Sequence, residues 1–200
     1  MIKCVIFDLG GVILNNYPMR ACKRLAKHCP LTPDEVAWFA PKRMHKLMDT
    51  GKISKKKLYQ QAVKNLGLKN ITQKRFEEIY ANIFTSNKPV QDLVKKLSKN
   101  YKLLLLSNTD DIHFTHVKKK FPILKLFKHL IVSYEVGYVK PSKQIYEEAL
   151  KKSGFAAKEC VFIDDHKENV PGAKKLGIKG LHYTTAAKLK KDLKSYGAKF

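Results

Sequence analysis

The chain has 200 residues and a formal net charge of +23, because 36 Lys and 4 Arg stand against only 17 acidic residues. That length allows one core domain and a modest second module, since domains commonly contain about 100 to 150 residues. Nucleic-acid readers favour arginine and gather their charge on one face. The lysines here are spread along the whole chain. Nucleic-acid binding is therefore disfavoured as the main role, and only a general attraction for anionic substrates is expected.

Cysteine usage and the N-terminus indicate a reduced, cytoplasmic protein without a membrane span. The four cysteines form no CxxC pair, which favours free thiols. They are Cys4, Cys22, Cys29 and Cys160. Asp8 interrupts the first apolar stretch, so no signal peptide is expected. The apolar run from Leu103 to Leu106 is far shorter than the roughly 20 residues that a membrane span requires.

The first candidate element is Lys3 to Ile13, with the sequence KCVIFDLGGVI. Its four consecutive apolar residues predict a strand that is buried on both faces, as in a parallel sheet. Asp8 then lies at the carboxyl edge of that strand, where ligands of open α/β sheets bind. The two glycines that follow allow a sharp turn. Asp8 is therefore a candidate for the chemistry of the protein.

Residues 15–88 contain several helix signals and no convincing strand. A first helix is expected from Met19 to Cys29. Further helix starts are expected where a hydroxyl side chain can cap the first turn. These starts are at Thr32, Ser54 and Thr72. Pro41 is expected to end the helix that begins after Thr32. The segment is interpreted as an inserted bundle of helices, the cap.

Strands and helices alternate over residues 89–200, which predicts a doubly wound parallel sheet with right-handed crossovers. The expected strands are Lys102–Leu106, His129–Ser133, Cys160–Ile163 and Gly180–Tyr183. The expected helices are Val90–Leu97, Ile112–Phe121, Ser142–Ser153, Val170–Leu176 and a basic helix at the C-terminus. The prediction is an α/β core domain of residues 1–14 and 89–200 that carries a cap of residues 15–88.

Polar residues follow four of these segments, where the carboxyl ends of parallel strands meet. Besides Asp8, they are Ser107 with Asn108, Lys140, and Asp164 with Asp165. A carboxylate can simply cap the next helix, a Ser-Asn pair can belong to a turn, and one lysine among 36 can be solvated. Adjacent aspartates are harder to explain in that way, because their like charges repel each other and a bound cation usually compensates for this repulsion. The pair therefore favours a cation site.

Taken in order, the segments FDLGGV, LLSNT, VKPSKQIYEEAL and FIDDHKENV resemble the four motifs of the haloacid dehalogenase superfamily of phosphohydrolases. The resemblance covers the chain outside the insertion and points to subfamilies with a small helical cap after the first motif. The chain looks most like the sugar-phosphatase branch that includes glucose-1-phosphatases and the phosphatase domain of soluble epoxide hydrolases. The resemblance implies a Rossmann-like fold and a magnesium-dependent phosphomonoesterase for a small phosphorylated metabolite, with sugar phosphates as candidate substrates.

The resemblance also implies a nucleophile and a metal site. Asp8 would attack phosphorus and form an aspartyl-phosphate, which water then releases. Mg²⁺, a hard cation that prefers oxygen ligands, would be held by Asp8, by the backbone carbonyl of Gly10 and by Asp165. Asp164 would be a further carboxylate near the metal, and Asn169 would orient the ligands.

Three residues are implied to bind the phosphoryl group. Ser107 and the backbone amide of Asn108 would donate hydrogen bonds to its oxygens, and Lys140 would place a positive charge against them. Phosphoryl transfer depends on this neutralisation of the phosphoryl oxygens. Asp8, Ser107 and Lys140 are thus the predicted catalytic residues.

Gly10 departs from the superfamily pattern. Most of its phosphatases carry a second aspartate here, which protonates the leaving oxygen and later activates water. Such help is typically worth about 10²- to 10⁴-fold, so the acidity of the leaving group is expected to control the rate. Members of the sugar-phosphatase branch share the Asp-Leu-Gly pattern, so the gap does not imply inactivity. His166 is the one imidazole within a motif and a candidate substitute, whereas His113 and His116 are interpreted as ordinary helix residues.

Two other functions stay open on the sequence alone. Gly10 is compatible with a catalytically weak or silent protein that keeps the fold to bind a phosphorylated ligand or a protein partner. A 2-haloacid dehalogenase would use the same aspartate without a metal. That branch usually has an aromatic residue where Gly10 stands and lacks the paired acids Asp164 and Asp165, so it is disfavoured.

Neither the substrate nor the oligomeric state can be read from a motif. Specificity would come from the insertion between Asn15 and Lys88. Tyr17, Met44 and Met48 are candidates to face the crevice, with core packing as the alternative.

Overall fold

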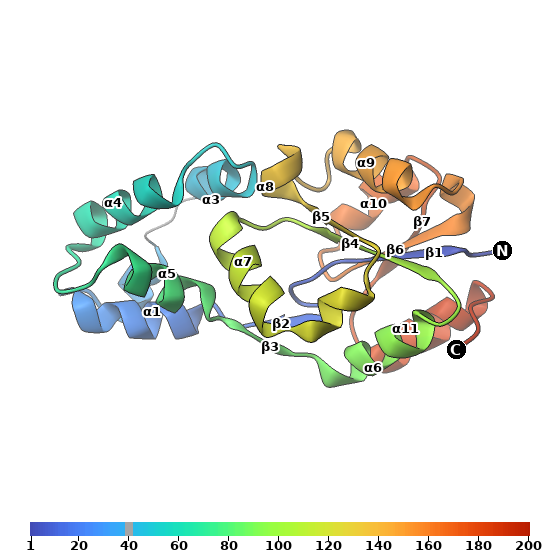
Figure 1. Ribbon diagram of the computed structural model, residues 1–200, viewed down its shortest axis with the longest axis horizontal. Coiled ribbons are helices and arrows are strands. Elements are labelled where there is room, and N and C mark those ends of the chain that lie inside the picture. The colour runs from blue at the N-terminus through green and yellow to red at the C-terminus, as the bar shows by residue number, and fades with distance from the viewer. Residues whose placement is uncertain (39–41) are drawn as a thin grey trace.

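The computed structural model describes residues 1–38 and 42–200, with side chains except at residues 42–45. At its centre lies a five-stranded sheet in the order β5-β4-β1-β6-β7 (Figure 1). Its strands are β1 (Cys4–Phe7), β4 (Lys102–Ser107), β5 (His129–Val132), β6 (Cys160–Asp164) and β7 (Lys179–His182). All neighbouring strands are parallel, which confirms the predicted doubly wound α/β fold. The central position of β1 puts Asp8 in the middle of the carboxyl edge.

Helices cover both faces of the sheet, which explains the consecutive apolar residues of its strands. Val5 and Phe7 of β1 pack in one cluster with α6 and α11, whereas Cys4 and Ile6 pack with α9 and α10. Figure 1 shows these two pairs of helices on opposite sides of the sheet. The core helices are α6 (Lys88–Leu97), α7 (Asp111–Lys120), α8 (Ser133–Val136), α9 (Lys143–Ser153), α10 (Asn169–Lys174) and α11 (Ala186–Ser195). Two 3₁₀ turns, η2 (Pro122–Leu126) and η3 (Ala157–Glu159), complete the connections.

The insertion forms a group of helices at the end of the molecule opposite the two termini (Figure 1). It contains α1 (Met19–Leu25), η1 (Ala26–His28), α2 (Pro33–Ala37), α3 (Lys42–Asp49), α4 (Lys55–Leu66) and α5 (Gln73–Ala81). These helices share a hydrophobic cluster of their own. Its members include Leu25, Val36, Leu58, Ala62, Phe76 and Ile79. We call α1 to α5 the cap.

A short ribbon connects the cap to the core. It consists of β2 (Leu14–Asn16) and β3 (Phe84–Ser86), which pair in antiparallel fashion at the two ends of the insertion. The sequence did not predict these strands, because three-residue segments show no periodicity that separates them from loops. The domain division into residues 1–14 with 89–200 and residues 15–88 stays a prediction.

Hydroxyl side chains begin three cap helices as predicted. Thr32 Oγ1 accepts a hydrogen bond from the backbone N–H of Glu35 at 3.4 Å, and the Glu35 carboxylate accepts one from the backbone N–H of Thr32 at 2.8 Å. Ser54 and Thr72 accept the equivalent backbone bonds at 3.2 Å each. These bonds satisfy amides that the first turn of a helix leaves without partners.

The helix predicted from Met19 to Cys29 is shorter than expected. It ends at Leu25 and is followed by η1, and Cys29 is extended. The reason is Pro30, because a proline disfavours helical backbone at the residue before it. Pro41 and the side chain of Met44 lie outside the described residues.

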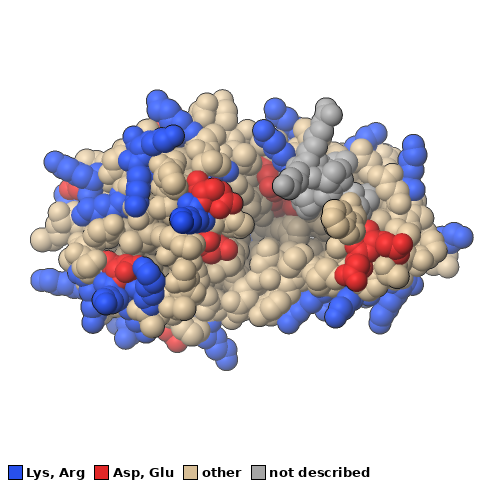
Figure 2. Space-filling view, turned by 180° about the vertical axis from the view of Figure 1, so that it is seen from behind, with Lys and Arg blue, Asp and Glu red and all other residues tan. Residues whose placement is uncertain are grey.

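The lysines and arginines are distributed around the molecule. Figure 2 shows them around the outline of both halves of one face, with a hollow near its centre that Asp and Glu side chains border. This pattern agrees with solvated lysines. Within residues 1–38 and 42–200, no helix is long and apolar enough to cross a membrane.

Candidate active site

The carboxyl ends of β1, β4 and β6 meet at a pocket of about 470 Å³, the catalytic pocket. Asp8 follows β1 and Ser107 ends β4, and both line this pocket. Asp164 ends β6 and contacts Lys140, which also lines it. Residues of the loops and the cap complete the lining. They include Gly10, Asn16, Asp49, Phe84, Asn108, Thr109, His166, Glu168 and Asn169.

Lys140 forms a buried ion-pair network with two carboxylates. Its Nζ lies 2.7 Å from Asp8 Oδ1 and 2.6 Å from Asp164 Oδ2, and its side chain is 1% exposed. Burial raises the pKa of Asp8 to about 7, although Lys140 acts in the opposite direction. Burial alone would lower the pKa of Lys140, but the two carboxylates raise it above its usual value. Lys140 therefore stays charged beside the predicted nucleophile.

Asn108 holds the backbone of Lys140 in place. Its Nδ2 donates to the Lys140 carbonyl at 3.0 Å, and its Oδ1 accepts from the Lys140 N–H at 2.8 Å. The sequence prediction used only the backbone amide of Asn108. The role of the side chain was missed because its partner lies 32 residues away, beyond any local pattern.

Asp164 is the best-satisfied carboxylate of the site. Besides the Lys140 ammonium, it accepts hydrogen bonds from the backbone N–H of His166 at 2.7 Å and from Asn169 Nδ2 at 3.1 and 3.0 Å. The Asn169 carbonyl in turn accepts a bond from the Tyr146 hydroxyl at 2.7 Å. The lone pairs of Asp164 are thus largely occupied by the protein, and it orients Lys140.

Asp165 differs from Asp164 in having an unsatisfied oxygen. Its Oδ1 is buried and has no hydrogen-bond partner among the described residues. One carboxylate oxygen from each of Asp8, Asp164 and Asp165 lies within 4.8 Å of the others. A Cβ at Gly11 would lie 2.2 Å from Asp165 Oδ2, so glycine is needed there to make room for the carboxylate. Such clustered oxygens suit a hard cation, and the residues present fit Mg²⁺.

Ser107 and Gly10 leave room for a ligand. Ser107 is 3% exposed and lines the catalytic pocket, and its hydroxyl makes no hydrogen bond within the described part of the chain. A Cβ at Gly10 would meet only Phe84 Cε1, at 3.7 Å. That is ordinary contact, so the backbone at residue 10 accepts a Cβ.

The histidines occupy different environments. His166 lines the catalytic pocket but is 62% exposed, and its Nδ1 lies 3.3 Å from Glu168. His113 is more buried, with Nδ1 2.6 Å from Asp110 Oδ2, and its ring centroid lies 4.4 Å from that of Tyr80. The sequence treated His113 as an ordinary helix residue. Asp110, three positions earlier, was the signal that could have identified this pair.

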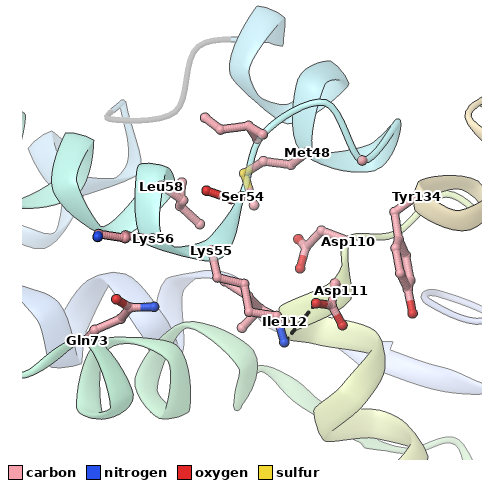
Figure 3. A pocket seen from close by; sticks show the side chains of 12 residues that line it. Met48, Ser54, Lys55, Lys56, Leu58, Gln73, Asp110, Asp111, Ile112 and Tyr134 are labelled. Carbon is pink, nitrogen blue, oxygen red and sulfur yellow. Dashed lines mark ion pairs between the residues drawn. The ribbon is translucent and has the colours of Figure 1, made fainter.

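A separate cavity of about 520 Å³ lies where the cap meets α7 and α8 (Figure 3). Lys55 at the start of α4 reaches across it to Asp111 of α7, with 2.8 Å between Nζ and Oδ2. Met48 is buried and lines this cavity, whereas Tyr17 is 43% exposed. Neither of them lines the catalytic pocket.

The parallel sheet, the helical insertion after its first strand and the carboxylates with lysine at its carboxyl edge define a Rossmann-like hydrolytic enzyme. Residues 2–177 match the haloacid dehalogenase-like hydrolase family, and the chain belongs to this family. The predicted superfamily is therefore confirmed. The narrower resemblance to the branch with glucose-1-phosphatases and soluble epoxide hydrolases stays a prediction.

Several relatives are similar over nearly the whole chain. The D-ribitol-5-phosphate phosphatase of Bacteroides thetaiotaomicron is 25% identical over 96% of this chain and 97% of its own. The sesquiterpene phosphatase astK of Aspergillus oryzae is 25% identical over 91% of this chain and 90% of its own. A HAD family enzyme from Bacteroides thetaiotaomicron, solved with magnesium and inorganic phosphate, matches with a TM-score of 0.80 at 27% identity and covers 92% of this chain and 95% of that one.

Proposed function

We propose that this protein is a magnesium-dependent phosphomonoesterase that acts on a small phosphorylated metabolite through an aspartyl-phosphate intermediate. The observation that carries the proposal is the buried contact of Lys140 with Asp8 and Asp164 beside the unsatisfied oxygen of Asp165. It combines a nucleophile, a fixed positive charge and oxygen ligands in one site, as phosphoryl transfer requires. The phosphatase names of two relatives support the same activity.

In this mechanism a carboxylate oxygen of Asp8 attacks phosphorus and forms a new O–P bond while the ester O–P bond breaks. Ser107 and the backbone amide of Asn108 donate hydrogen bonds to the phosphoryl oxygens, and Lys140 balances their charge. The ester oxygen takes up a proton and leaves as an alcohol. Water then attacks the aspartyl-phosphate, which releases inorganic phosphate and restores the Asp8 carboxylate.

The residues that would hold Mg²⁺ are Asp8, the backbone carbonyl of Gly10 and Asp165, with Asp164 close by and Asn169 orienting it. The bound ion supplies charge neutralisation as a Lewis acid. Asp164 already accepts four hydrogen bonds, so we expect Asp165 to be the stronger ligand of the two. The bound magnesium and phosphate of the Bacteroides structure support this cofactor.

We also propose a class of substrate and a location for the protein. The name of the Bacteroides relative supports a polyol or sugar phosphate, and that of the Aspergillus relative supports a terpenoid phosphate. We expect neither a membrane nor a nucleic acid as partner, and a cytoplasmic location. The four free cysteines agree with a reducing compartment.

Turnover of p-nitrophenyl phosphate with magnesium, and in excess chelator, tests the proposal. We expect release of nitrophenol and inorganic phosphate that stops in chelator and returns when magnesium is added. Chloride release from 2-chloropropionate in chelator would support a dehalogenase instead. Binding of phosphate without turnover of any ester would support a silent binding protein.

A further inference from the structure

A cavity of about 400 Å³ lies between the cap and the core and borders the catalytic pocket. We call it the cap cavity. The two spaces share five lining residues, which are Asn16, Asp49, Phe84, Asn108 and Thr109. The cavity of Figure 3 shares no described lining residue with the catalytic pocket. The cap cavity is therefore the space into which the organic group of a substrate extends from phosphorus.

Most side chains that line the cap cavity are apolar. They include Met19, Ala21, Leu25, Val36, Phe76, Tyr80 and Ile83. Some apolar side chains at or next to lining residues in the sequence are exposed. Met19, which lines the cavity, is 36% exposed. Tyr17, which precedes the lining residue Pro18, is 43% exposed, and Trp38, which follows the lining residue Ala37, is 86% exposed.

One unsatisfied polar atom belongs to this lining. His113 Nε2 is buried and has no partner among the described residues, and the His113 ring lines the cap cavity. The other ring nitrogen, Nδ1, lies 2.6 Å from Asp110 Oδ2, so Nε2 is the nitrogen left for a ligand. A single hydroxyl of a ligand would satisfy it, because a hydroxyl can both donate and accept a hydrogen bond.

We infer that the substrate is a phosphate monoester of a hydrocarbon-rich alcohol, whose organic group fills the cap cavity and whose one further hydroxyl forms a hydrogen bond with His113 Nε2. This inference rests on the proposed phosphatase activity and specifies its substrate. Four polar lining residues are shared with the catalytic pocket, and Asp110 is already bound to His113. Beyond the border with the catalytic pocket, a sugar would bring several hydroxyls into a mainly apolar space, and unpaired buried hydroxyls lower affinity. A hydrocarbon group gains affinity with each buried methylene.

Binding of n-alkyl phosphonates with four, six and eight carbons tests this substrate class. These compounds keep the phosphoryl charge and cannot be hydrolysed, so calorimetry with magnesium present reports binding alone. We expect Kd to fall about fourfold per methylene, the ratio that corresponds to about 0.8 kcal/mol per buried CH₂. The heat-capacity change should become more negative with chain length. The value of kcat/KM should be at least about tenfold higher for hexyl phosphate than for D-ribitol 5-phosphate.

Two positions on α1 provide matched variants. Cys22→Trp fills the cap cavity, because Cys22 lines it, whereas Lys23→Trp adds the same side chain at an exposed position of the same helix. We expect Cys22→Trp to remove the dependence of Kd on chain length and Lys23→Trp to keep it. Met19→Glu places a charge at an exposed lining position with little effect on folding. It should weaken the binding of octyl phosphonate more than that of butyl phosphonate.

The outcomes separate the substrate class from the activity. A Kd that does not change with chain length, together with efficient turnover of D-ribitol 5-phosphate, would overturn the hydrocarbon class and leave the phosphatase standing. Chain-length-dependent binding without turnover of any ester would overturn the activity and leave the ligand class standing.

A second inference concerns Asp49, the last residue of α3. Its side chain lines both the catalytic pocket and the cap cavity. It therefore lies at their junction, where the oxygen that joins phosphorus to the organic group must also lie. The charged or titratable groups that act on it are Asp110, which caps α7, His113 of α7 and Tyr80 of α5. α8, which also packs against α3, contributes Tyr134 and Glu135.

The geometry points to Asp49 as the general acid and base that Gly10 does not supply. In the first step its carboxylic acid gives a proton to the ester oxygen as the bond to phosphorus breaks. In the second step its carboxylate takes a proton from the attacking water, which restores the acid. Burial and Asp110 raise the pKa of Asp49 to about 6, a value suited to both steps near neutral pH. His166 is a weaker candidate because it is 62% exposed.

Substitution Asp49→Asn tests this role through the leaving group. We expect kcat/KM to fall about 10²-fold on hexyl phosphate but less than about fivefold on p-nitrophenyl phosphate, whose leaving group needs no proton. Adding Gly10→Asp to this variant should restore the rate on hexyl phosphate, because a carboxylic acid at residue 10 would supply the missing proton, and a Cβ there makes only ordinary contact, with Phe84 Cε1 at 3.7 Å. Glu78→Gln, at an exposed carboxylate of the cap, serves as the control.

Thermal melting adds a readout that does not depend on activity. The pKa of Asp49 is higher in the folded than in the unfolded state, so stability declines as pH rises from about 4 through about 6. Asp49→Asn should therefore raise Tm at pH 8 and leave it unchanged at pH 4. Equal losses on both esters would assign Asp49 to binding, and an unchanged rate on hexyl phosphate would remove it from the mechanism. If wild type hydrolyses neither ester, the proposed activity fails.

Discussion

The catalytic edge of the sheet and the cap cavity differ in polarity. At the edge, Lys140 contacts two carboxylates and Asp164 accepts four hydrogen bonds. In the cap cavity the lining is mainly apolar. Lys140 and Asp164 are thus fixed in advance, whereas each region also has one buried atom without a partner in the described part of the chain, Asp165 Oδ1 at the edge and His113 Nε2 in the cap cavity.

The catalytic edge and the cap cavity are also held in place by different parts of the fold. The catalytic side chains follow strands that are buried on both faces of one sheet, so their positions are fixed by the core. The cap cavity lies between that core and helices that join it through the two-stranded ribbon of β2 and β3. Substitutions at the edge should therefore affect the chemical step most, and, apart from Asp49, substitutions at the contact of cap and core should affect it least.

Asp8→Asn should have the largest effect. The amide has the shape of the carboxylate but is barely nucleophilic, so we expect turnover of p-nitrophenyl phosphate to fall by about 10³-fold or more. Circular dichroism should show an intact fold. Activity within about tenfold of wild type would contradict the aspartyl-phosphate mechanism.

Lys140→Met should be the most destabilising change at the edge. It leaves Asp8 and Asp164 buried without their cation, which costs about 3–5 kcal/mol at neutral pH. The loss should shrink as pH falls, because protonation removes the unpaired charges. Denaturant unfolding at pH 7 and pH 5 measures both effects. Lys143→Met, at a lysine whose side chain is 69% exposed, should change stability by less than about 0.5 kcal/mol.

Much of the catalytic edge could be predicted from the sequence because its signals are local. Each buried strand is a short apolar run. Asp8 directly follows β1, and Ser107 and Asp164 end β4 and β6. Lys140 lies further along the chain, between α8 and α9, and its motif predicted it. Asp8, Ser107 and Lys140 line one pocket, as expected. The strands are parallel, so their carboxyl ends lie together at one edge of the sheet.

The remaining features depend on contacts between distant parts of the chain. The Asn108 side chain finds the Lys140 backbone 32 residues away, and β2 pairs with β3 across the whole cap. Asp49 reaches the catalytic pocket only because α3 docks near the sheet edge. No spacing rule connects these residues, so the sequence could not predict their roles.

The paired aspartates should separate in their effects on magnesium. Asp165 has a buried oxygen without a partner among the described residues, whereas Asp164 is held by Lys140 and Asn169. We expect Asp165→Ala to weaken magnesium binding by about 10²-fold and Asp164→Ala by about tenfold. Asp164→Ala should instead lower Tm more, because three donors, on Lys140, His166 and Asn169, lose an acceptor. Calorimetric titration with magnesium and melting curves measure the two effects. Weaker magnesium binding in Asp164→Ala than in Asp165→Ala would contradict this prediction.

The smallest effect is expected at the ion pair that crosses from the cap to the core. Lys55 Nζ lies 2.8 Å from Asp111 Oδ2 (Figure 3), but the two side chains are 34% and 47% exposed. Exposed pairs are worth about 0.2–1 kcal/mol and are screened by salt. Lys55→Met should therefore lower the free energy of unfolding by less than about 1 kcal/mol, and the difference should vanish in about 1 M salt.

Lys56→Met is the matched control, because Lys56 lines the same cavity as Lys55 and follows it on α4. If apolar packing holds the cap on the core, both variants should keep kcat/KM on hexyl phosphate within about twofold of wild type. If kcat/KM fell about tenfold in Lys55→Met alone, without a matching loss of stability, the ion pair would hold the cap over the substrate. The contact of cap and core would then be a fixed part of the site, like the catalytic edge.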